Sequence, residues 1–292
     1  MDRFLNLSLN GIANGMIFAA VALALVLIWR ATRVVNFAQG AMLMFTTFVA
    51  ANVIDATGSY WLGFGAALGC GLLLGGVVEI VLIRPVENKP PLNAVIVTLG
   101  LLILLQAGAG MLFGGQPRSY PPAFDIRGYT LFGNHLLFSP FDLFTVGAVG
   151  GLALLLLLLF RGTSLGLSMR AAAFAPETAR MLGVQVGRML TLGWALAAVA
   201  GALAGVLVAP AVFLGPYQFD PVLVFGFTAA IIGGLDSPVG AVIGGVVLGL
   251  VLSYVSGYVD SSLTTLGSLG VLILVLMLRP QGLFSRTTTR AV

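Results

Sequence analysis

The sequence predicts an all-α, polytopic integral membrane helical bundle, and three observations support this fold class. Of its 292 residues 59% are hydrophobic and 8% are charged, and the mean hydropathy is +1.07, far outside the range of soluble globular domains. Long uncharged runs recur along the whole chain. The segments between these runs are short and leave no place for a soluble domain, so we expect a single transmembrane domain over residues 1–292.

Nine uncharged runs are expected to form spanning or partly spanning segments, because a helix needs about 20 apolar residues to cross a membrane. These runs are Phe4–Trp29, Val34–Ile54, Ala56–Val78, Leu92–Phe113, Leu143–Phe160, Met189–Val212, Pro221–Leu235, Ser237–Val259 and Ser261–Leu278.

The basic residues predict how these segments are oriented. If the direction alternates from an outside N-terminus, eleven of the 14 Lys and Arg residues, Arg286 and Arg290 among them, lie on the cytoplasmic side. Only Arg3, Arg118 and Arg127 remain outside. Because loops with more Lys and Arg stay inside, we expect an external N-terminus and a cytoplasmic C-terminus.

One interval, Thr163–Arg188 within a cytoplasmic loop at 161–188, does not fit a membrane. Ser164 is expected to cap a helix from about Leu165 to Ala175. Pro176 then ends that helix and occupies the first position of a second one, which continues to Leu182. The interval therefore predicts two short helices that meet at a corner.

Gly183 is expected to end the second helix as a left-handed cap, and Glu177 places a carboxylate in its favourable first turn. Charged residues such as Arg170 alternate with apolar ones in both helices. The expected apolar face consists of Met169, Ala172, Ala173, Phe174, Ala179 and Leu182. Such a face has no evident role inside one connecting loop, and a partner protein would provide one.

Two of the nine segments do not fit simple membrane rods. Asn36, Gln39 and Gly40 interrupt the start of the second run, and the clean helix left from Ala41 to Ile54 would cover only about 21 Å. The seventh run, Pro221–Leu235, has fifteen residues and is bounded by prolines and by a glycine-rich turn. Non-helical backbone at membrane depth must be buried in protein or line a wet cavity.

Paired interruptions of this kind are the best sequence indication of a transport site. The candidate path residues are Asn36, Gln39 and Gly40, together with Gly233 and Gly234 at the start of the glycine-rich turn. Ordinary hydrogen bonds between helices and loop packing remain the alternative.

Residue types for catalysis are scarce. The chain has one histidine, no pair of acids inside a run and no His/Cys constellation, so we expect no catalytic residues, no metal site and no cofactor. Its only lysine, Lys89, follows Asn88 rather than glycine, which rules out the usual phosphate-binding loop for ATP. With one lysine and no basic cluster, nucleic acid is not an expected ligand.

The segment at 114–138 is the only sizeable external loop. It contains three prolines and the single histidine, His135. Both a docking surface and a plain connection are consistent with this composition.

Four stretches together resemble a known family. They are VVNFAQGAM at 34–42, GLSMRAAAFAPETARMLGV at 166–184, IIGGLDSPVGAVIGG at 231–245 and LRPQGLF at 278–284. In this order and spacing the chain resembles the LivH type of permease subunit from bacterial ABC importers for branched-chain amino acids. Glu177, Ala179 and Gly183 match the spacing of the motif that such permeases present to their ATPases, although Thr178 replaces the usual alanine.

The resemblance implies a multi-pass protein of the bacterial inner membrane with several partners. These are two cytoplasmic ATP-binding subunits, a second similar permease and a periplasmic substrate-binding protein. It further implies that Arg170, Pro176, Glu177, Ala179 and Gly183 contribute to coupling with the ATPases. Urea or short amides remain alternative substrates, and an autonomous secondary carrier or channel remains the alternative from another class.

Overall fold

The computed structural model describes residues 2–87, 89–128, 130–131, 134–135, 138–279 and 282. Arg286 and Arg290 lie outside the described residues. Nearly every element is helical, apart from two strands of two residues each, β1 (Thr130–Leu131) and β2 (Asn134–His135), which pair antiparallel. The longer helices are α1 (Asp2–Thr32), α2 (Gln39–Thr57), α3 (Tyr60–Val78), α4 (Pro91–Phe113), α5 (Pro140–Gly162), α8 (Val186–Val212), α10 (Pro238–Tyr258) and α11 (Thr264–Leu278).

Eight helical segments of the described chain are long and apolar enough to cross a membrane. Two of them include short irregular turns, since α3 continues through η1 (Glu79–Ile83) and η2 (Arg84–Val86), and η3 (Ser261–Leu263) leads into α11. The seventh of the nine expected spanning or partly spanning segments is not among these eight, in keeping with the short run that the sequence shows there. That run forms α9 (Asp220–Gly233), whose 14 residues extend over only about 21 Å.

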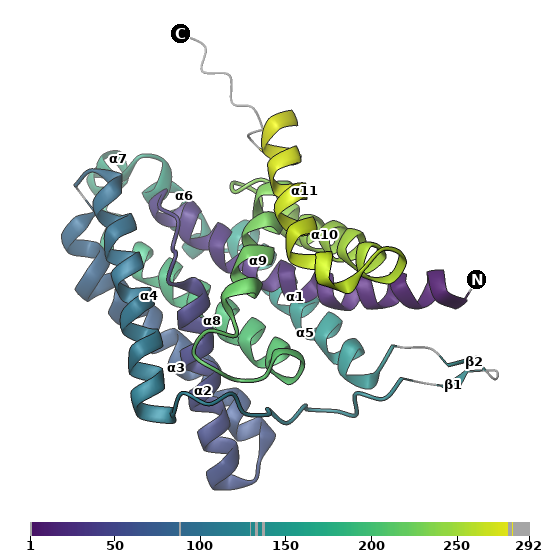
Figure 1. Cartoon of the computed structure of the whole chain (residues 1–292). Coiled ribbons are helices and arrows are strands. Elements are labelled where there is room, and N and C mark those ends of the chain that lie inside the picture. The colour runs from purple at the N-terminus through teal and green to yellow at the C-terminus, as the bar shows by residue number, and fades with distance from the viewer. Residues whose placement is uncertain are drawn as a thin grey trace.

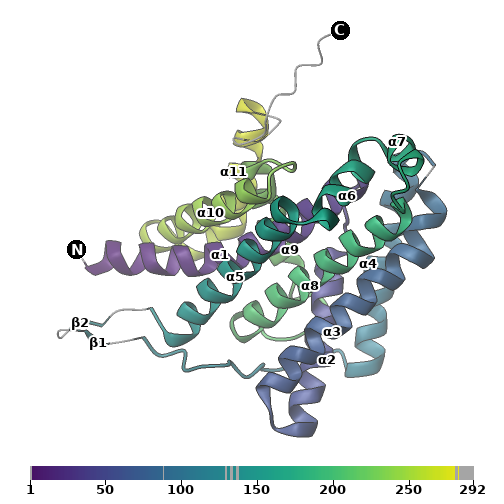
Figure 2. The same cartoon turned by 180° about the vertical axis from the view of Figure 1, so that it is seen from behind.

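Helix α1 packs against α10, α8 and α9, and α9 and α10 also pack against each other (Figures 1 and 2). Close approach to α10 depends on glycine. A Cβ on Gly15 would lie 2.8 Å from the carbonyl oxygen of Gly245, and one on Gly11 would lie 2.9 Å from the Cα of Leu250. Small residues at four-residue spacing therefore serve packing within the subunit here, because they let two helix backbones touch.

Helix α2 begins earlier than expected. The structure places Gln39 and Gly40 inside α2, which has 19 residues and a length of about 28 Å. Asn36 causes the difference: its Oδ1 accepts a hydrogen bond from the backbone N–H of Ala38 at 3.0 Å and so closes the break one residue before the helix starts. The expected short clean helix over Ala41–Ile54 is therefore wrong, and α2 is long enough to span.

The outer helices α4, α5 and α11 present rows of uncovered apolar side chains, in contrast to α1. Examples are Leu104, Leu158 and Ile273, each more than half exposed. Lipid would cover such surfaces in a membrane, so they need no explanation as binding sites.

The expected external segment follows α4 and packs back on the bundle in its described part. Arg118 pairs with Leu214 in an isolated antiparallel bridge, and its guanidinium lies 3.4 Å from the Asp55 carboxylate. Tyr120 is buried, and this burial raises the pKa of its phenol. The segment after α4 is thus anchored at the ends of α2 and α8.

Candidate functional site

The expected corner is present as two short helices at one end of the molecule, α6 (Ser164–Phe174) and α7 (Pro176–Met181) (Figure 1). The N-cap of α6 is Thr163 rather than Ser164, because the Thr163 hydroxyl accepts a hydrogen bond from the backbone N–H of Gly166 at 3.1 Å. Thr163 has the extended backbone that an N-cap requires, with φ −122° and ψ 153°, whereas Ser164 is already helical. The expected cap was one residue too late.

Proline makes the corner. Helix α6 ends at Phe174, and Pro176 occupies the first position of α7, as the sequence predicts. Ala175 between them has φ −144° and ψ 75°, because a residue that precedes proline is sterically driven out of the helical region.

Gly183 ends α7 in the left-handed conformation, with φ 83°, which confirms the expected cap. The backbone N–H of Val184 donates to the carbonyl of Ala179 at 2.9 Å, and the N–H of Gly183 donates to Arg180 at 3.0 Å. These two bonds form the double closure known as a Schellman motif. A Cβ at Gly183 would meet nothing within 4 Å, so only the backbone conformation demands glycine here.

The expected apolar face of the corner is divided in two. Met169, Ala172 and Ala179 are buried against the molecule itself, where Ala172 and Ala179 cluster with Val186 and Leu190 of α8. This part of the face therefore fixes α6 and α7 to the membrane helices and is not free for a partner.

The other part of the face is uncovered. Phe174 is 90% exposed, Met181 is 89% exposed and Leu182 is 79% exposed. Met181 was not in the expected set. Its position in the last turn of α7, next to Leu182, could have indicated from the sequence that it belongs to this face. In the structure its side chain is exposed like those of Phe174 and Leu182. These three side chains, Phe174, Met181 and Leu182, are referred to below as the exposed corner.

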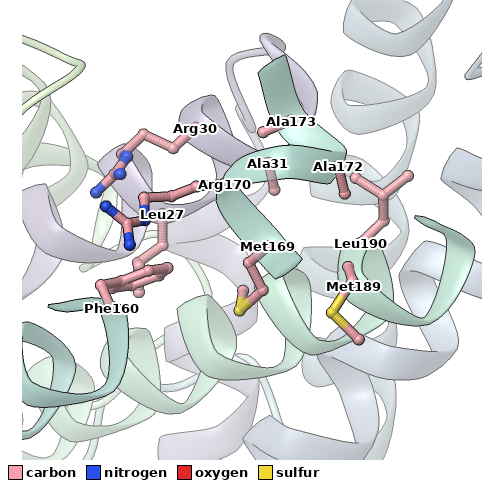
Figure 3. Close-up of a pocket in the computed structure, with 10 residues that line it drawn as sticks. All are labelled: Leu27, Arg30, Ala31, Phe160, Met169, Arg170, Ala172, Ala173, Met189 and Leu190. Atoms are coloured by element: carbon pink, nitrogen blue, oxygen red, sulfur yellow. The ribbon is translucent and has the colours of Figure 1, made fainter. Parts of the chain in front are cut away.

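Charged side chains surround the exposed corner. Glu177 and Arg180 form an exposed ion pair at 2.7 Å. Burial raises the pKa of the Glu87 carboxyl, and the positive charge of Arg180 lowers it. The charge of Arg180 on α7 therefore acts on the segment that follows η2. Arg170 lies apart from this group, because it faces α1 and α5 rather than the tip of the corner (Figure 3).

The candidate path residues Asn36 and Gln39 are fully buried, at 1% and 0% exposure. The amide of Asn36 donates to Oε1 of Gln39 at 3.1 Å, and Nε2 of Gln39 donates to the carbonyl of Ala197 in α8 at 3.3 Å. A Cβ on Gly201 would lie 2.3 Å from that same Nε2, so α8 approaches closely. These two amides fasten the start of α2 to α8 inside one subunit.

The glycine candidates lie in tight packing as well. Gly40 faces Leu223 of α9, and a Cβ on Gly233 would collide with the backbone of Gly240 across the turn between α9 and α10. Gly234 follows with φ 85°, which only glycine adopts readily.

The structure does not join these two sets of candidates directly. In the described part of the chain, no hydrogen bond runs from Asn36 or Gln39 to the turn after α9. The ion pair of Arg33 with Asp236 connects the two regions instead, from the end of α1 to that turn.

Two amides that the path prediction omitted lie in a different situation. Asn10 and Asn14 on α1 are exposed, and Nδ2 of Asn14 donates to Oδ1 of Asn10 at 2.6 Å. Their neighbours Gly11 and Gly15 touch α10 around Gly245 and Gly249, the eighth and twelfth of its 21 residues. The two amides therefore lie level with the middle of a helix long enough to cross a membrane. The signal in the sequence was the four-residue spacing of polar residues within the first run.

Among the described residues, no group of three or more His, Cys, Asp or Glu side chains could hold a metal ion. The acid nearest to a span interior, Glu79, is used structurally: Arg84 bonds both of its oxygens, and Oε2 also accepts from the Thr191 hydroxyl at 2.6 Å.

Comparison with known proteins decides the family. Residues 7–278 match the family model described as the branched-chain amino acid transport system permease component. The chain belongs to this permease family. It is accordingly a transport subunit of the kind found in ABC importers.

Relatives of the permease match over almost their full length. The chain is 31% identical to the high-affinity branched-chain amino acid transport system permease protein LivH of Salmonella typhimurium, covering 99% of this chain and 98% of that protein. It is 27% identical to the permease protein BraD of Pseudomonas aeruginosa with the same coverage. Among solved structures, PsaBC from Streptococcus pneumoniae in complex with Fab aligns with a TM-score of 0.51 at 13% identity, over 93% of this chain and 91% of that one. This last likeness concerns the fold alone.

Proposed function

We propose that this permease forms the translocation path of an ATP-driven importer in the bacterial inner membrane. Its substrates are branched-chain amino acids delivered by a periplasmic binding protein. The observation that supports this most strongly is the exposed corner, because Phe174, Met181 and Leu182 leave a large apolar surface on helices that cannot lie within a span.

Two cytoplasmic ATP-binding subunits, one for each permease of a pair, cover this surface in the proposed complex. Pro176 and Gly183 make the corner stiff, Glu177 presents a charge, and Ala179 ties α7 to α8. Arg170 of α6 lines a small cavity beside the end of α1. A push on the tip would then move α8 and α1 as rigid bodies, because the buried half of the apolar face is packed against them.

The proposed orientation of the chain in the membrane rests on which helix ends lie on the same side of the molecule. The end of α1 meets the turn after α9 through Arg33 and Asp236, and η2 meets the start of α8 through Arg84. At the opposite end, Arg118 meets Asp55. This grouping agrees with helices that alternate in direction, with α9 as a ninth, partly spanning segment, an outside N-terminus and a cytoplasmic C-terminus.

The whole chain, residues 1–292, acts as one transmembrane domain in the proposal, with a coupling loop at 161–188 and an external loop at 114–138. A second, similar permease stands beside it. Exposed amides at mid-membrane depth are costly in lipid, so Asn10 and Asn14 are assigned to a water-filled path between the two permeases. Asn36, Gln39, Gly40, Gly233 and Gly234 support that path by holding α2, α8, α9 and α10 in position.

The substrate class rests on the relatives, since LivH and BraD are described as parts of branched-chain amino acid transport systems. The chain agrees with a neutral or zwitterionic solute, because the interior of its spans lacks an unpaired charge among the described residues. A carrier driven by protons usually needs such a charge.

Co-purification followed by uptake tests the proposal. The permease, expressed with its candidate ATPases, a second permease and a binding protein, should remain in one complex. After reconstitution the complex should take up labelled leucine only with ATP and binding protein. Urea and a short amide serve as competing solutes in the same assay.

Uptake by the purified permease alone, without ATPase subunits, would contradict the importer and favour an autonomous carrier. If an excess of unlabelled urea or amide suppressed the ATP-dependent uptake and an excess of unlabelled leucine did not, the importer function would stand. The assignment of branched-chain amino acids as its substrates would then be wrong.

A further inference from the structure

A small cavity of about 30 Å³ lies where α1, α5, α6 and α8 meet. Its lining is apolar except for two arginines, Arg30 of α1 and Arg170 of α6. Figure 3 shows both guanidinium groups on the same side of the cavity, close to the ring of Phe160. The guanidinium carbon of Arg30 is 5.1 Å from the centre of that ring.

The positive charge at this cavity is not balanced. In the part of the chain that the structure describes, neither arginine forms an ion pair, and the only hydrogen bond of the Arg170 side chain goes to the carbonyl of Gly166 at 3.3 Å. Arg33 and Arg170 act on Arg30 as like charges, and the one opposing acid, Asp236, is already paired with Arg33. Two guanidiniums side by side without a counter-ion repel each other, so this arrangement favours a bound anion.

The depth of the cavity indicates where the anion comes from. Arg30 lies in the last turn of α1 and Phe160 lies two residues before the end of α5, and both helices are of membrane length. Arg170 approaches from α6, which begins directly after α5 and lies outside the spans. The two arginines therefore sit at headgroup level, above apolar walls that belong to the span ends.

We propose that this cavity is a binding site for the phosphate group of an anionic phospholipid. The planar guanidiniums of Arg30 and Arg170 would donate paired hydrogen bonds to phosphate oxygens, a geometry in which arginine is preferred over lysine. The site stands on the cavity itself and does not depend on the importer function.

A lipid bound here would bridge α1 and α6, the two elements that the cavity separates. A carboxylate from an ATPase subunit is the competing occupant. It fits less well, because the walls belong to span ends, whereas the exposed corner that a protein partner would meet lies farther along, beyond Arg170.

Lipid retention by the purified full-length permease tests the site. The protein is equilibrated in neutral detergent with equal amounts of phosphatidylglycerol and phosphatidylcholine, and bound lipid is measured by native mass spectrometry. The wild type should retain phosphatidylglycerol preferentially. Arg30→Gln and Arg170→Gln should each weaken that retention about tenfold, the effect of losing a charge-assisted hydrogen bond. Arg188→Gln is the matched control, since Arg188 is exposed and does not line the cavity.

A second variant distinguishes loss of the binding site from unfolding of the protein. Ala173→Glu keeps both arginines and adds a carboxylate at the cavity wall, so it should displace phosphatidylglycerol while the protein stays folded. Equal retention of the two lipids by the wild type, or equal loss in Arg188→Gln, would overturn the proposal. So would complete displacement of phosphatidylglycerol by millimolar inorganic phosphate, which would identify a free anion as the ligand. If the two arginine variants bound lipid normally but lost the ATPase subunits, the site would belong to a protein partner and the proposal would be wrong.

Discussion

The corner of α6 and α7 and the start of α2 both interrupt the spanning helices, yet their side chains differ in exposure to solvent. At the corner, Phe174 and Met181 are about nine-tenths exposed, although burial would stabilise them. At the start of α2, Asn36 and Gln39 are fully buried and hydrogen-bonded within the subunit. An uncovered apolar side chain indicates a missing partner, whereas a buried and satisfied amide indicates internal structure.

The largest effect is expected where the corner is changed. Phe174→Asp combined with Met181→Asp should weaken binding of the ATPase subunits by about 100-fold, because two apolar side chains lose their burial in the complex. Membrane insertion and the melting temperature of the isolated permease should stay the same, since both side chains are exposed there. The measurement is the amount of ATPase that co-purifies. Gln185→Asp, which adds one negative charge at an exposed polar residue of the same loop, is the control.

The exposed amides of α1 come next. Replacing Asn10 and Asn14 by leucine should lower uptake about tenfold without loss of assembly, because the path would lose its hydrogen-bonding surface at mid-membrane depth. Initial rates of uptake in reconstituted complexes check this. Asn52→Leu removes another exposed amide, on α2, which donates a hydrogen bond to the carbonyl of Phe48, and should leave uptake normal. Equal effects of the two changes would place Asn10 and Asn14 outside the path.

Substitutions at the start of α2 should lower the stability of the permease. Asn36→Ala and Gln39→Ala are each expected to cost about 1–3 kcal/mol, because the remaining buried partner is left unsatisfied. A lower melting temperature with an unchanged KM for uptake is the expected result. A changed KM at an unchanged melting temperature would instead assign these residues to direct contact with solute. An unchanged melting temperature together with unchanged kinetics in a normally assembled complex would remove any role in supporting the path.

Of the two regions where a loss of stability is expected, Gly183 should show the smaller loss. Gly183→Val should cost about 1–2 kcal/mol, since a β-branched residue is strained at the observed positive φ while its side chain meets no neighbour. Coupling between ATP hydrolysis and uptake should suffer more than stability does, because the chain direction after α7 changes. Gly183→Asn is the matched variant, as asparagine tolerates this conformation better. Equal coupling in Val, Asn and wild type would show that the corner need not be stiff.

The two regions also differ in how far the sequence could predict them. The corner depends on local signals, proline at 176 and glycine at 183, and both acted as expected because they constrain their own backbone. The start of α2 depends on Gln39 reaching Ala197 and Gly201, which lie some 160 positions away in the chain. Hydrophobic runs and turn residues are local patterns and do not predict a contact between residues so far apart in the sequence.

Exposure was equally hard to anticipate. The sequence could list an apolar face for the corner, but only packing against α8 shows that Ala172 and Ala179 belong to the interior while Phe174 does not. In the same way, the polar residues of the first run looked no different from those of the second. The close contact of α1 with α10 is what places Asn10 and Asn14 level with the middle of α10.

The most direct test of the account is cysteine labelling at the corner. After Cys70→Ala, single cysteines replace Met181 in one variant and Ser119 of the external segment in another. A membrane-impermeant thiol reagent should reach the first only from the cytoplasmic side and the second only from outside. Binding of the ATPase subunits should then slow labelling at position 181 strongly and leave position 119 unchanged. Labelling of both positions from outside, or labelling at 181 that the ATPase subunits do not slow, would contradict the assignment of the exposed corner as the ATPase docking surface.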